Sequence, residues 1–218
     1  MKSLNNWLLV LSVLSCFGCS SPVHEDDRGC AFVSDSIQYR VEFMSAGCVR
    51  ILSFPEGDTL VTKRLVVDSE KPAFKDYKWE DTGQKLLFRT RELSVVFDKA
   101  DAAFIFQETS TGKLLLKEKG DRKARNFKRS VAGGEQCLEV TQCFVPTEDE
   151  AIYGLGQYQN GIMNYRGKSV LLLQANMDIV NPFLISTNGY GVLWDNYSST
   201  KFEDTKEGYS FTSEVGDA

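Results

Sequence analysis

Few side chains in this sequence have the chemistry of a catalytic nucleophile or base. The chain of 218 residues has a single histidine, His24, which lies in an acidic segment near the N-terminus. Histidine-activated serine or cysteine catalysis is therefore not expected, because the imidazole must lie beside its nucleophile. Gly154 and Gly156 do not continue into a G-x-G-x-x-G pattern, and no helix-like sequence follows them. A phosphate-binding loop is therefore not expected either.

Cysteine usage predicts neither a metal site nor one particular disulfide. Two of the six cysteines, Cys16 and Cys19, lie in the N-terminal segment. The other four allow three disulfide pairings, and buried free thiols are an equal alternative. These four contain no C-x-x-C pair, so we expect no metal ion and no cofactor; they are Cys30, Cys48, Cys137 and Cys143.

The charge balance argues against a nucleic-acid partner. Asp and Glu number 30 against 25 Lys and Arg, for a formal net charge of −5. One basic cluster, residues 122–129, has no stacking aromatics and is predicted to be a charged loop or an exposed strand face. Two carboxylates about 5–5.5 Å apart would suffice for a retaining glycosidase, but the sequence alone does not identify such a pair.

The elements that would position these side chains are predicted to be strands throughout. Residues 36–43 alternate between apolar and polar side chains, which is typical of a half-buried strand. Turn signals recur about every ten residues and no run has a helical period, so we predict an all-β, antiparallel β-sandwich. One possible helical turn lies at 147–152. The further predicted strands are 48–54, 59–67, 85–91, 93–98, 103–108, 113–117 and 137–145.

One stretch, residues 151–202, holds most of the turn glycines and the only Asn-Pro step. Residues 169–173 form an apolar strand-like run that enters a polar bend at 174–178. Residues 183–194 predict a hairpin, because Asn188 and Gly189 suit the positive φ that a tight turn requires.

The N-terminus has the composition of an export signal. Residues 1–18 contain one lysine and an apolar run too short to span a membrane, which predicts a signal peptide. Gly18 and the following serines resemble a bacterial lipoprotein cleavage box with Cys19 as the lipidated residue. Cys16 and a plain signal peptide are the alternatives. Residues 19–29 are predicted to be a solvated acidic tether, and residues 30–218 one β-sandwich domain.

Four motifs in the stretch 151–202 resemble one family. They are YGLGQ (153–157), the N-x-D bend (176–178), NPF (181–183) and GYGVLWDN (189–196). The sequence resembles the N-terminal β-sandwich of glycoside hydrolase family 31, the α-glucosidases and α-xylosidases, and leans toward the bacterial α-xylosidases. The resemblance implies a galactose-mutarotase-like sandwich. Mutarotase activity is not carried over, because that chemistry needs a histidine acid.

In that family the catalytic aspartates lie on a (β/α)₈ barrel that follows the sandwich. The resemblance therefore implies that the catalytic barrel is absent from this chain and that no catalytic residue lies in it. We expect the chain to be truncated before the barrel, as a fragment. The face that docks the barrel would then be uncovered, and an exposed apolar patch usually marks a missing partner.

The resemblance also implies a substrate-binding loop. In family members the loop that matches residues 176–181 reaches over the barrel mouth, so Asp178 and Asn176 are the candidate substrate-binding residues. The alternative is that Asp178 only caps its own turn. An electrostatic role for Gln157 is doubtful, because relatives often have glutamate there. Trp194 and Tyr197 could stack on a sugar, but packing at a domain seam is the favoured interpretation.

These observations give one favoured function and two alternatives. The favoured function is the N-terminal domain of an exported, exo-acting α-glycosidase that frames the active-site mouth and is inactive alone. Its expected partners are the C-terminal catalytic domain, an oligosaccharide substrate bound through it, and the outer membrane, reached through a lipid anchor, on the periplasmic or cell-surface side. The alternatives are a stand-alone glycan-binding surface lipoprotein and a structural sandwich with no sugar role.

Overall fold

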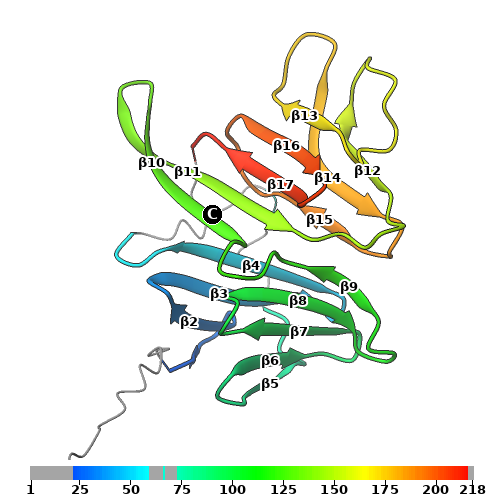
Figure 1. Cartoon of the computed structure of the whole chain (residues 1–218). Helices are drawn as coiled ribbons and strands as arrows, with labels where there is room; N and C mark the ends of the chain where they lie inside the picture. The colour runs from blue at the N-terminus through cyan, green and yellow to red at the C-terminus, as the bar shows by residue number, and fades with distance from the viewer. Residues whose placement is uncertain (1–21, 59–65, 67–72, 216–218) are drawn as a thin grey trace, which may run out of the picture.

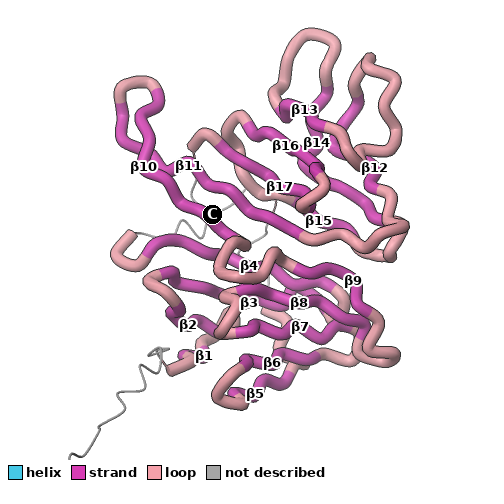
Figure 2. The backbone as a smooth tube through the Cα atoms, viewed as in Figure 1, coloured by secondary structure: helices cyan, strands magenta, loops and turns pink. Residues whose placement is uncertain are grey.

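The computed structural model describes residues 22–58, 66 and 73–215. Among these residues it contains seventeen strands and no helix (Figures 1 and 2). All named strand pairs are antiparallel, which confirms the predicted all-β sandwich. The predicted signal peptide 1–18, Cys19 and most of the predicted strand 59–67 lie outside the described residues.

The N-terminal half of the chain forms two facing sheets. One sheet has the strand order β1-β2-β3-β4 and the other has the order β5-β6-β7-β8-β9. The strands of the first sheet are β1 (His24–Glu25), β2 (Cys30–Ser34), β3 (Ile37–Ser45) and β4 (Cys48–Pro55). Those of the second are β5 (Lys78–Asp81), β6 (Lys85–Arg89), β7 (Leu93–Asp98), β8 (Ala103–Glu108) and β9 (Leu114–Lys117).

The alternation seen in the sequence builds the core between these sheets. Tyr39, Val41 and Phe43 point inward from β3 and are each 1% exposed. They belong to one buried cluster with Phe88 and Phe97 of the second sheet. Tyr39 and Phe97 contact directly, with ring centroids 4.9 Å apart. Burial of these aromatic side chains is the main stabilising term in this half, since each removes a large apolar area from water.

The C-terminal half forms a second pair of sheets. One has the order β10-β11-β17-β16-β13 and the other the order β12-β14-β15. The first contains β10 (Arg125–Ala132), β11 (Glu135–Phe144), β13 (Ser169–Leu172), β16 (Thr200–Thr205) and β17 (Gly208–Ser213). The second contains β12 (Ile152–Gln157), β14 (Ile179–Ser186) and β15 (Gly191–Leu193). The predicted 183–194 hairpin is confirmed as β14 and β15, which pair Phe183 with Leu193.

A second core lies between these two sheets. Phe202 and Phe211 from the five-stranded sheet are fully buried against Ile152 and Leu184 of the three-stranded sheet. The rings of Phe202 and Phe211 lie 5.3 Å apart in an edge-on arrangement, which is a favourable geometry for aromatic pairs. The two halves therefore have separate cores, stacked one above the other in Figure 1.

The halves are joined where β9 meets the end of β11. The amide of Val145 donates to the carbonyl of Lys117, and Lys119 donates to the carbonyl of Cys143, at 2.9 and 3.1 Å. Phe106 packs against both cores. Backbone pairing thus makes the five-stranded sheet of each half nearly continuous with that of the other.

A buried ion pair lies at the same junction. Glu118 and Arg125 form it, and each side chain is only 3% exposed. The Arg125 guanidinium also lies over the rings of Tyr39 and Phe104, at 5.1 and 5.2 Å. The prediction of a charged loop or exposed face for residues 122–129 is therefore wrong for Arg125, because Glu118 and two aromatic rings draw it into the junction.

Two further predictions need correction. Within the predicted acidic tether, His24 and Glu25 form β1, and the Glu25 carboxylate accepts hydrogen bonds from Trp79 (2.9 Å) and Tyr77 (3.1 Å). Strong donors on the body of the domain therefore hold this acidic segment in place. The predicted helical turn at 147–152 is wrong: residues 148–149 form a single turn, closed by the Glu150 amide donating to the Thr147 carbonyl at 3.3 Å, and strand β12 begins at Ile152.

Candidate docking face and substrate loop

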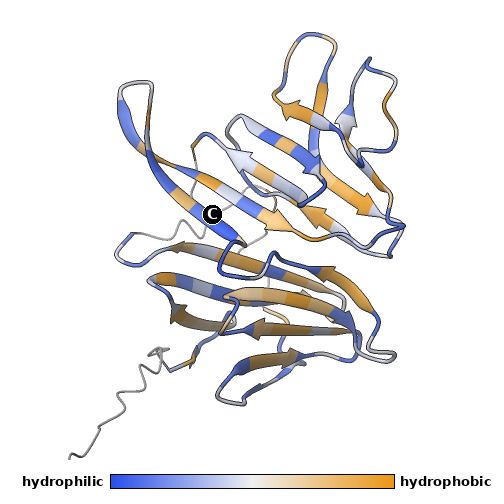
Figure 3. Cartoon of the chain, in the orientation of Figure 1, coloured by the Kyte–Doolittle hydropathy of each residue, from blue (hydrophilic) through white to orange (hydrophobic). Residues whose placement is uncertain are grey.

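The three-stranded sheet β12-β14-β15 has apolar side chains on its outer face as well as on its inner face. On β14, Leu184 and Ser186 are buried, whereas Phe183 and Ile185 are 37% and 52% exposed. An antiparallel sheet with one solvated face normally has polar residues there. Figure 3 shows the apolar colouring of β14 and β15.

Strand register makes these exposed side chains one continuous patch. Tyr153 of β12 lies opposite Ile185, and Phe183 lies opposite Leu193 of β15. Gly191 allows Phe183 to lie across β15, because a Cβ atom at residue 191 would come within 2.7 Å of the Phe183 ring. We call these four apolar residues of β12, β14 and β15 the outer face. Such a contiguous patch is typical of a surface that binds a partner.

The predicted substrate loop connects β13 to β14, the strand that carries Phe183 and Ile185 of the outer face. Asn176 is exposed and Asp178 is half-buried, and Asp178 directly precedes β14. Met177 between them has a φ of 73° and is 67% exposed. The structure therefore places both predicted substrate-binding residues just before the start of β14, on a tight turn at the edge of the domain remote from the N-terminal half (Figure 1).

The turn is held by Gln174 rather than by the Asp178 carboxylate. The Gln174 side-chain amide donates to the Asp178 carbonyl at 2.8 Å and accepts from the amide of Val180 at 3.2 Å. The backbone amide of Asp178 donates to the carbonyl of Ala175 at 3.3 Å. The capping role considered for Asp178 is therefore filled by Gln174. A hydroxyl-bearing ligand at this turn would meet a carboxylate that these bonds do not engage.

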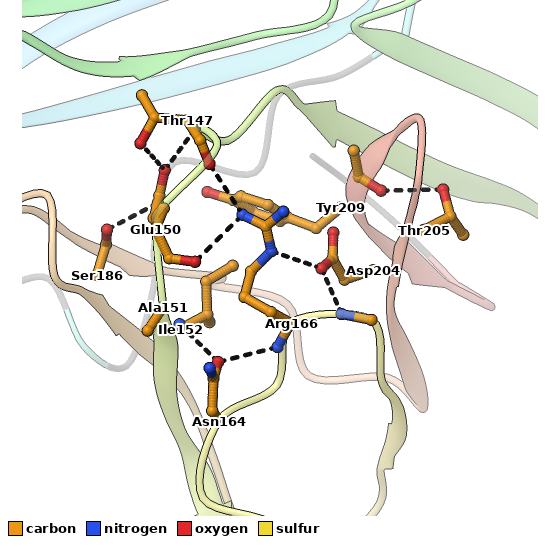
Figure 4. A network of polar contacts seen from close by, with 12 residues as sticks. Thr147, Glu150, Ala151, Ile152, Asn164, Arg166, Ser186, Asp204, Thr205 and Tyr209 are labelled. Atoms are coloured by element: carbon orange, nitrogen blue, oxygen red, sulfur yellow. Dashed lines mark hydrogen bonds and ion pairs between the residues drawn. The ribbon is translucent and has the colours of Figure 1, made fainter.

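A polar network fixes the segment that precedes β13 (Figure 4). The Arg166 guanidinium donates to Asp204 through Nε at 2.8 Å, and through Nη1 to the carbonyls of Thr147 (3.2 Å) and Glu150 (3.3 Å). The Asp204 side chain is only 1% exposed and also accepts from the Gly167 amide. The Arg166 guanidinium thus ties the turn before β12 to strand β16.

The same network continues through Glu150 to the hairpin. Its carboxylate accepts a hydrogen bond from Ser186 of β14 at 2.7 Å and another from the Tyr190 hydroxyl. Burial and the hydrogen bond to Glu150 raise the pKa of Tyr190, so this phenol stays a neutral donor. The strands that carry the outer face are therefore anchored from behind by buried hydrogen bonds, which gives the face a fixed shape.

The remaining residues considered for the site are Trp194, Tyr197 and Gln157. Trp194 stacks on Phe211 with ring centroids 5.4 Å apart and an interplanar angle of 9°, and its Nε1 donates to Ser213. This confirms the packing interpretation for Trp194. Tyr197 is 58% exposed, and Gln157 lies exposed at the end of β12. A glycan platform built on Trp194 is therefore not supported.

The particular residues of the outer face were missed in the sequence. The signal was present, because residues 179–186 are apolar at positions that face both ways along one strand. Such a run is typical of a strand covered on both sides. Among the described residues, no group of three or more His, Cys, Asp or Glu side chains could hold a metal ion. The same part of the chain contains no helix long and apolar enough to cross a membrane.

The architecture and the site define a galactose-mutarotase-like β-sandwich with an uncovered apolar face. The sequence matches the family described as the glycosyl hydrolase 31 N-terminal galactose mutarotase-like domain over residues 38–203. The chain belongs to this family.

Known relatives are carbohydrate-processing enzymes. An α-xylosidase of Saccharolobus solfataricus is 34% identical over 178 residues, which is 75% of this chain and 23% of the relative. The crystal structure of a family 31 α-xylosidase from Xanthomonas citri aligns with a TM-score of 0.71 and 30% identity, covering 84% of this chain and 20% of that one. A family 31 dextranase of Flavobacterium johnsoniae has a TM-score of 0.70 at 20% identity, covering 91% and 25%, and therefore shows the shared fold alone.

Proposed function

We propose that this domain is the N-terminal sandwich of an exo-acting α-glycosidase, acting on α-xylosides or α-glucosides. The observation that carries the proposal is the outer face, a contiguous apolar surface on the sheet whose strand β14 begins directly after the Asn176–Asp178 turn. The chain spans about a fifth of the length of the α-xylosidases that it matches. A (β/α)₈ barrel seated on the outer face would provide the catalytic aspartates.

In this arrangement the domain's own contribution is to shape the substrate entrance. The Asn176–Asp178 turn leads into β14, which carries Phe183 and Ile185 of the outer face, so a barrel that docked there and extended along β14 would bring the Asp178 carboxylate to its rim. A carboxylate accepts hydrogen bonds from sugar hydroxyls, and charge-assisted bonds are about twice as strong as neutral ones. Asn176 would add an amide that both donates and accepts.

The test is hydrolysis of p-nitrophenyl α-xyloside and α-glucoside. The chain alone is compared with a hybrid in which it replaces the matching region of the Xanthomonas citri α-xylosidase. We expect hydrolysis by the hybrid only, and Asp178→Ala should lower its kcat/KM about tenfold or more, as expected for one lost charged hydrogen bond. The control is Asp149→Ala in an exposed turn. Hydrolysis by the chain alone would overturn the proposal.

We further propose that Cys19 carries a lipid that holds the protein at the outer membrane. The support is the short apolar run before Gly18 and the small residues after Cys19. Detergent phase partition and mass spectrometry of the processed N-terminus test this. Cys19→Ala should release the protein into the aqueous phase, whereas an unchanged partition would reject the anchor at this residue.

A further inference from the structure

A cavity of about 640 Å³ lies between the two halves of the molecule. Strand β4 lines it from the N-terminal half, and the β14–β15 hairpin and β11 line it from the C-terminal half. Its size is within the range of small-molecule binding sites. The apolar part of the wall includes Leu93, Phe106, Leu115, Val192 and Trp194.

The cavity wall contains buried polar atoms that lack partners. Arg50 Nη2 and both carboxylate oxygens of Asp195 have no hydrogen-bond partner among the described residues. The two side chains are 10% and 19% exposed, and Arg50 Nη2 lies 3.9 Å from the Asp195 carboxylate, which is longer than a hydrogen bond. Buried polar groups in native proteins are almost always paired with protein, water or a ligand, so these atoms mark a place where a group that both donates and accepts can bind.

The charges around these atoms restrict the chemistry of that ligand. Arg50 Nη1 lies 3.3 Å from Glu42, Glu42 pairs with Arg40 at 2.8 Å, and Arg40 pairs with Asp26. Of this row only Arg50 and Asp195 line the cavity, and the other charged residues of its wall are Glu118 and Arg125. Two guanidinium groups therefore face two carboxylates, and the charges of the wall balance. A wall without net charge favours a neutral ligand over a charged one.

The remaining chemistry favours a sugar. A hydroxyl group is both a donor and an acceptor, so two adjacent hydroxyls can serve Asp195 and Arg50 together. The C–H face of a sugar ring suits an apolar wall of the kind formed by Leu93, Phe106 and Val192. The cavity is also reached from the surface, because the lining residues Met44 and Leu193 are 43% and 46% exposed.

We propose that this cavity binds one neutral sugar ring, with Asp195 accepting from one hydroxyl and Arg50 Nη2 donating to its neighbour. The cavity and the outer face share Phe183 and Leu193, so sugar binding is proposed for, and tested on, this chain by itself, without a docked barrel. Failure of the hybrid enzyme described above would leave it standing, and failure of sugar binding would leave the docking proposal standing.

Saturation-transfer NMR and calorimetry with D-xylose and D-glucose test the site on the whole chain. We expect millimolar binding that Asp195→Asn weakens about tenfold, because one charged acceptor becomes a neutral amide. Glu203→Gln is the matched control, since Glu203 is an exposed carboxylate on β16 and is paired with Lys201 at the surface. The Glu203→Gln variant should bind both sugars with wild-type affinity. The proposal would be overturned if Asp195→Asn also bound them with wild-type affinity, or if the wild type bound neither sugar.

Two charged probe ligands and one variant at the cavity opening complete the test. Glycine and methylammonium probe a zwitterion and a cation, and binding of either in preference to the sugars would overturn the assignment of a neutral ligand. Leu193→Trp narrows the opening at a residue that is 46% exposed, so the fold should tolerate it. Sugar binding should be lost in this variant, and retention of wild-type affinity would place the sugar outside the cavity.

Discussion

The two halves of the molecule differ in how many large apolar side chains they expose. In the N-terminal half, the exposed large hydrophobic side chains among the described residues are Met44, Val66 and Leu114. In the C-terminal half such residues are more numerous, and one group of them lies along three neighbouring strands and the loop beside them: Tyr153, Met177, Ile179, Phe183, Ile185 and Leu193. The N-terminal half therefore exposes few large apolar side chains to water. In the C-terminal half, one face of the three-stranded sheet packs against the core. The opposite face is also apolar but exposed, as expected for a surface that docks a partner.

The junction between the halves gives the largest expected effect. Arg125→Ala would leave the Glu118 carboxylate buried without its guanidinium, although the Phe104 amide would still donate to it at 2.7 Å. Breaking a buried pair in this way typically costs about 3–5 kcal/mol of unfolding free energy. Urea unfolding measures the loss.

The matched control for the junction is Lys128→Ala on the same strand. The Lys128 side chain is 67% exposed, and its amine lies 3.9 Å from Glu139. Removal of an exposed pair should cost less than about 1 kcal/mol. Equal losses for Arg125→Ala and Lys128→Ala would show that the junction does not depend on the buried pair.

Neighbouring residues of β14 test the difference between the two faces of the sheet. Leu184 is fully buried and Ile185 is 52% exposed. In the isolated chain, Leu184→Ala should cost about 2–5 kcal/mol by leaving a cavity. Ile185→Ala should change stability by about 0.5 kcal/mol or less. Thermal or chemical unfolding of both variants measures the contrast, and a similar loss in both would mean that the outer face is already covered in the isolated chain.

A smaller effect is expected at the N-terminal segment. Burial raises the pKa of Asp26, but hydrogen bonds from Arg40 and from the amides of Arg28 and Gly29 outweigh it and lower the pKa to about 2. A lowered carboxyl pKa stabilises the fold above the unfolded value of 3.8, and that stabilisation is lost as the pH falls through about 2.

Asp26→Asn tests this contribution. The Asp26 side chain is 36% exposed, so solvent screening should limit the loss to about 1 kcal/mol at pH 7. The difference from the wild type should shrink between pH 4 and pH 2, as measured by urea unfolding across that range. A difference that is independent of pH would show that the Asp26 charge is not the stabilising feature.

The sequence predicts most strands because apolar and polar residues alternate between regular turn signals, as residues 37–43 illustrate. It does not predict the burial of Arg125, because nothing local distinguishes this side chain from the exposed basic residues beside it. Its partner Glu118 lies seven residues earlier and meets it only through the β9–β11 junction. The pairing of His24–Glu25 with β2 is likewise set by distant donors, Tyr77 and Trp79.

The candidate site likewise has one part that the sequence predicts and other parts that depend on the fold. The Asn176–Asp178 turn was found from its motif, and the structure places it at the start of β14. The outer face was expected as an uncovered surface, but its residues depend on register, which pairs Tyr153 with Ile185 and Phe183 with Leu193. The cavity containing Arg50 and Asp195 could not be predicted, because its two walls come from different halves of the chain.

If the outer face is an interface, charges placed on it should disturb the docked protein and leave the isolated chain stable. The double variant Phe183→Lys, Ile185→Lys is made both in the isolated chain and in the Xanthomonas citri hybrid, with Leu114→Lys in the N-terminal half as the control. In the isolated chain the double variant should unfold within about 0.5 kcal/mol of the wild type, because both side chains are exposed there. In the hybrid it should lower α-xyloside hydrolysis at least about tenfold, because two charges would be buried against the barrel, while Leu114→Lys changes neither. A hybrid that keeps its activity with both lysines in place would show that the outer face is not the docking interface.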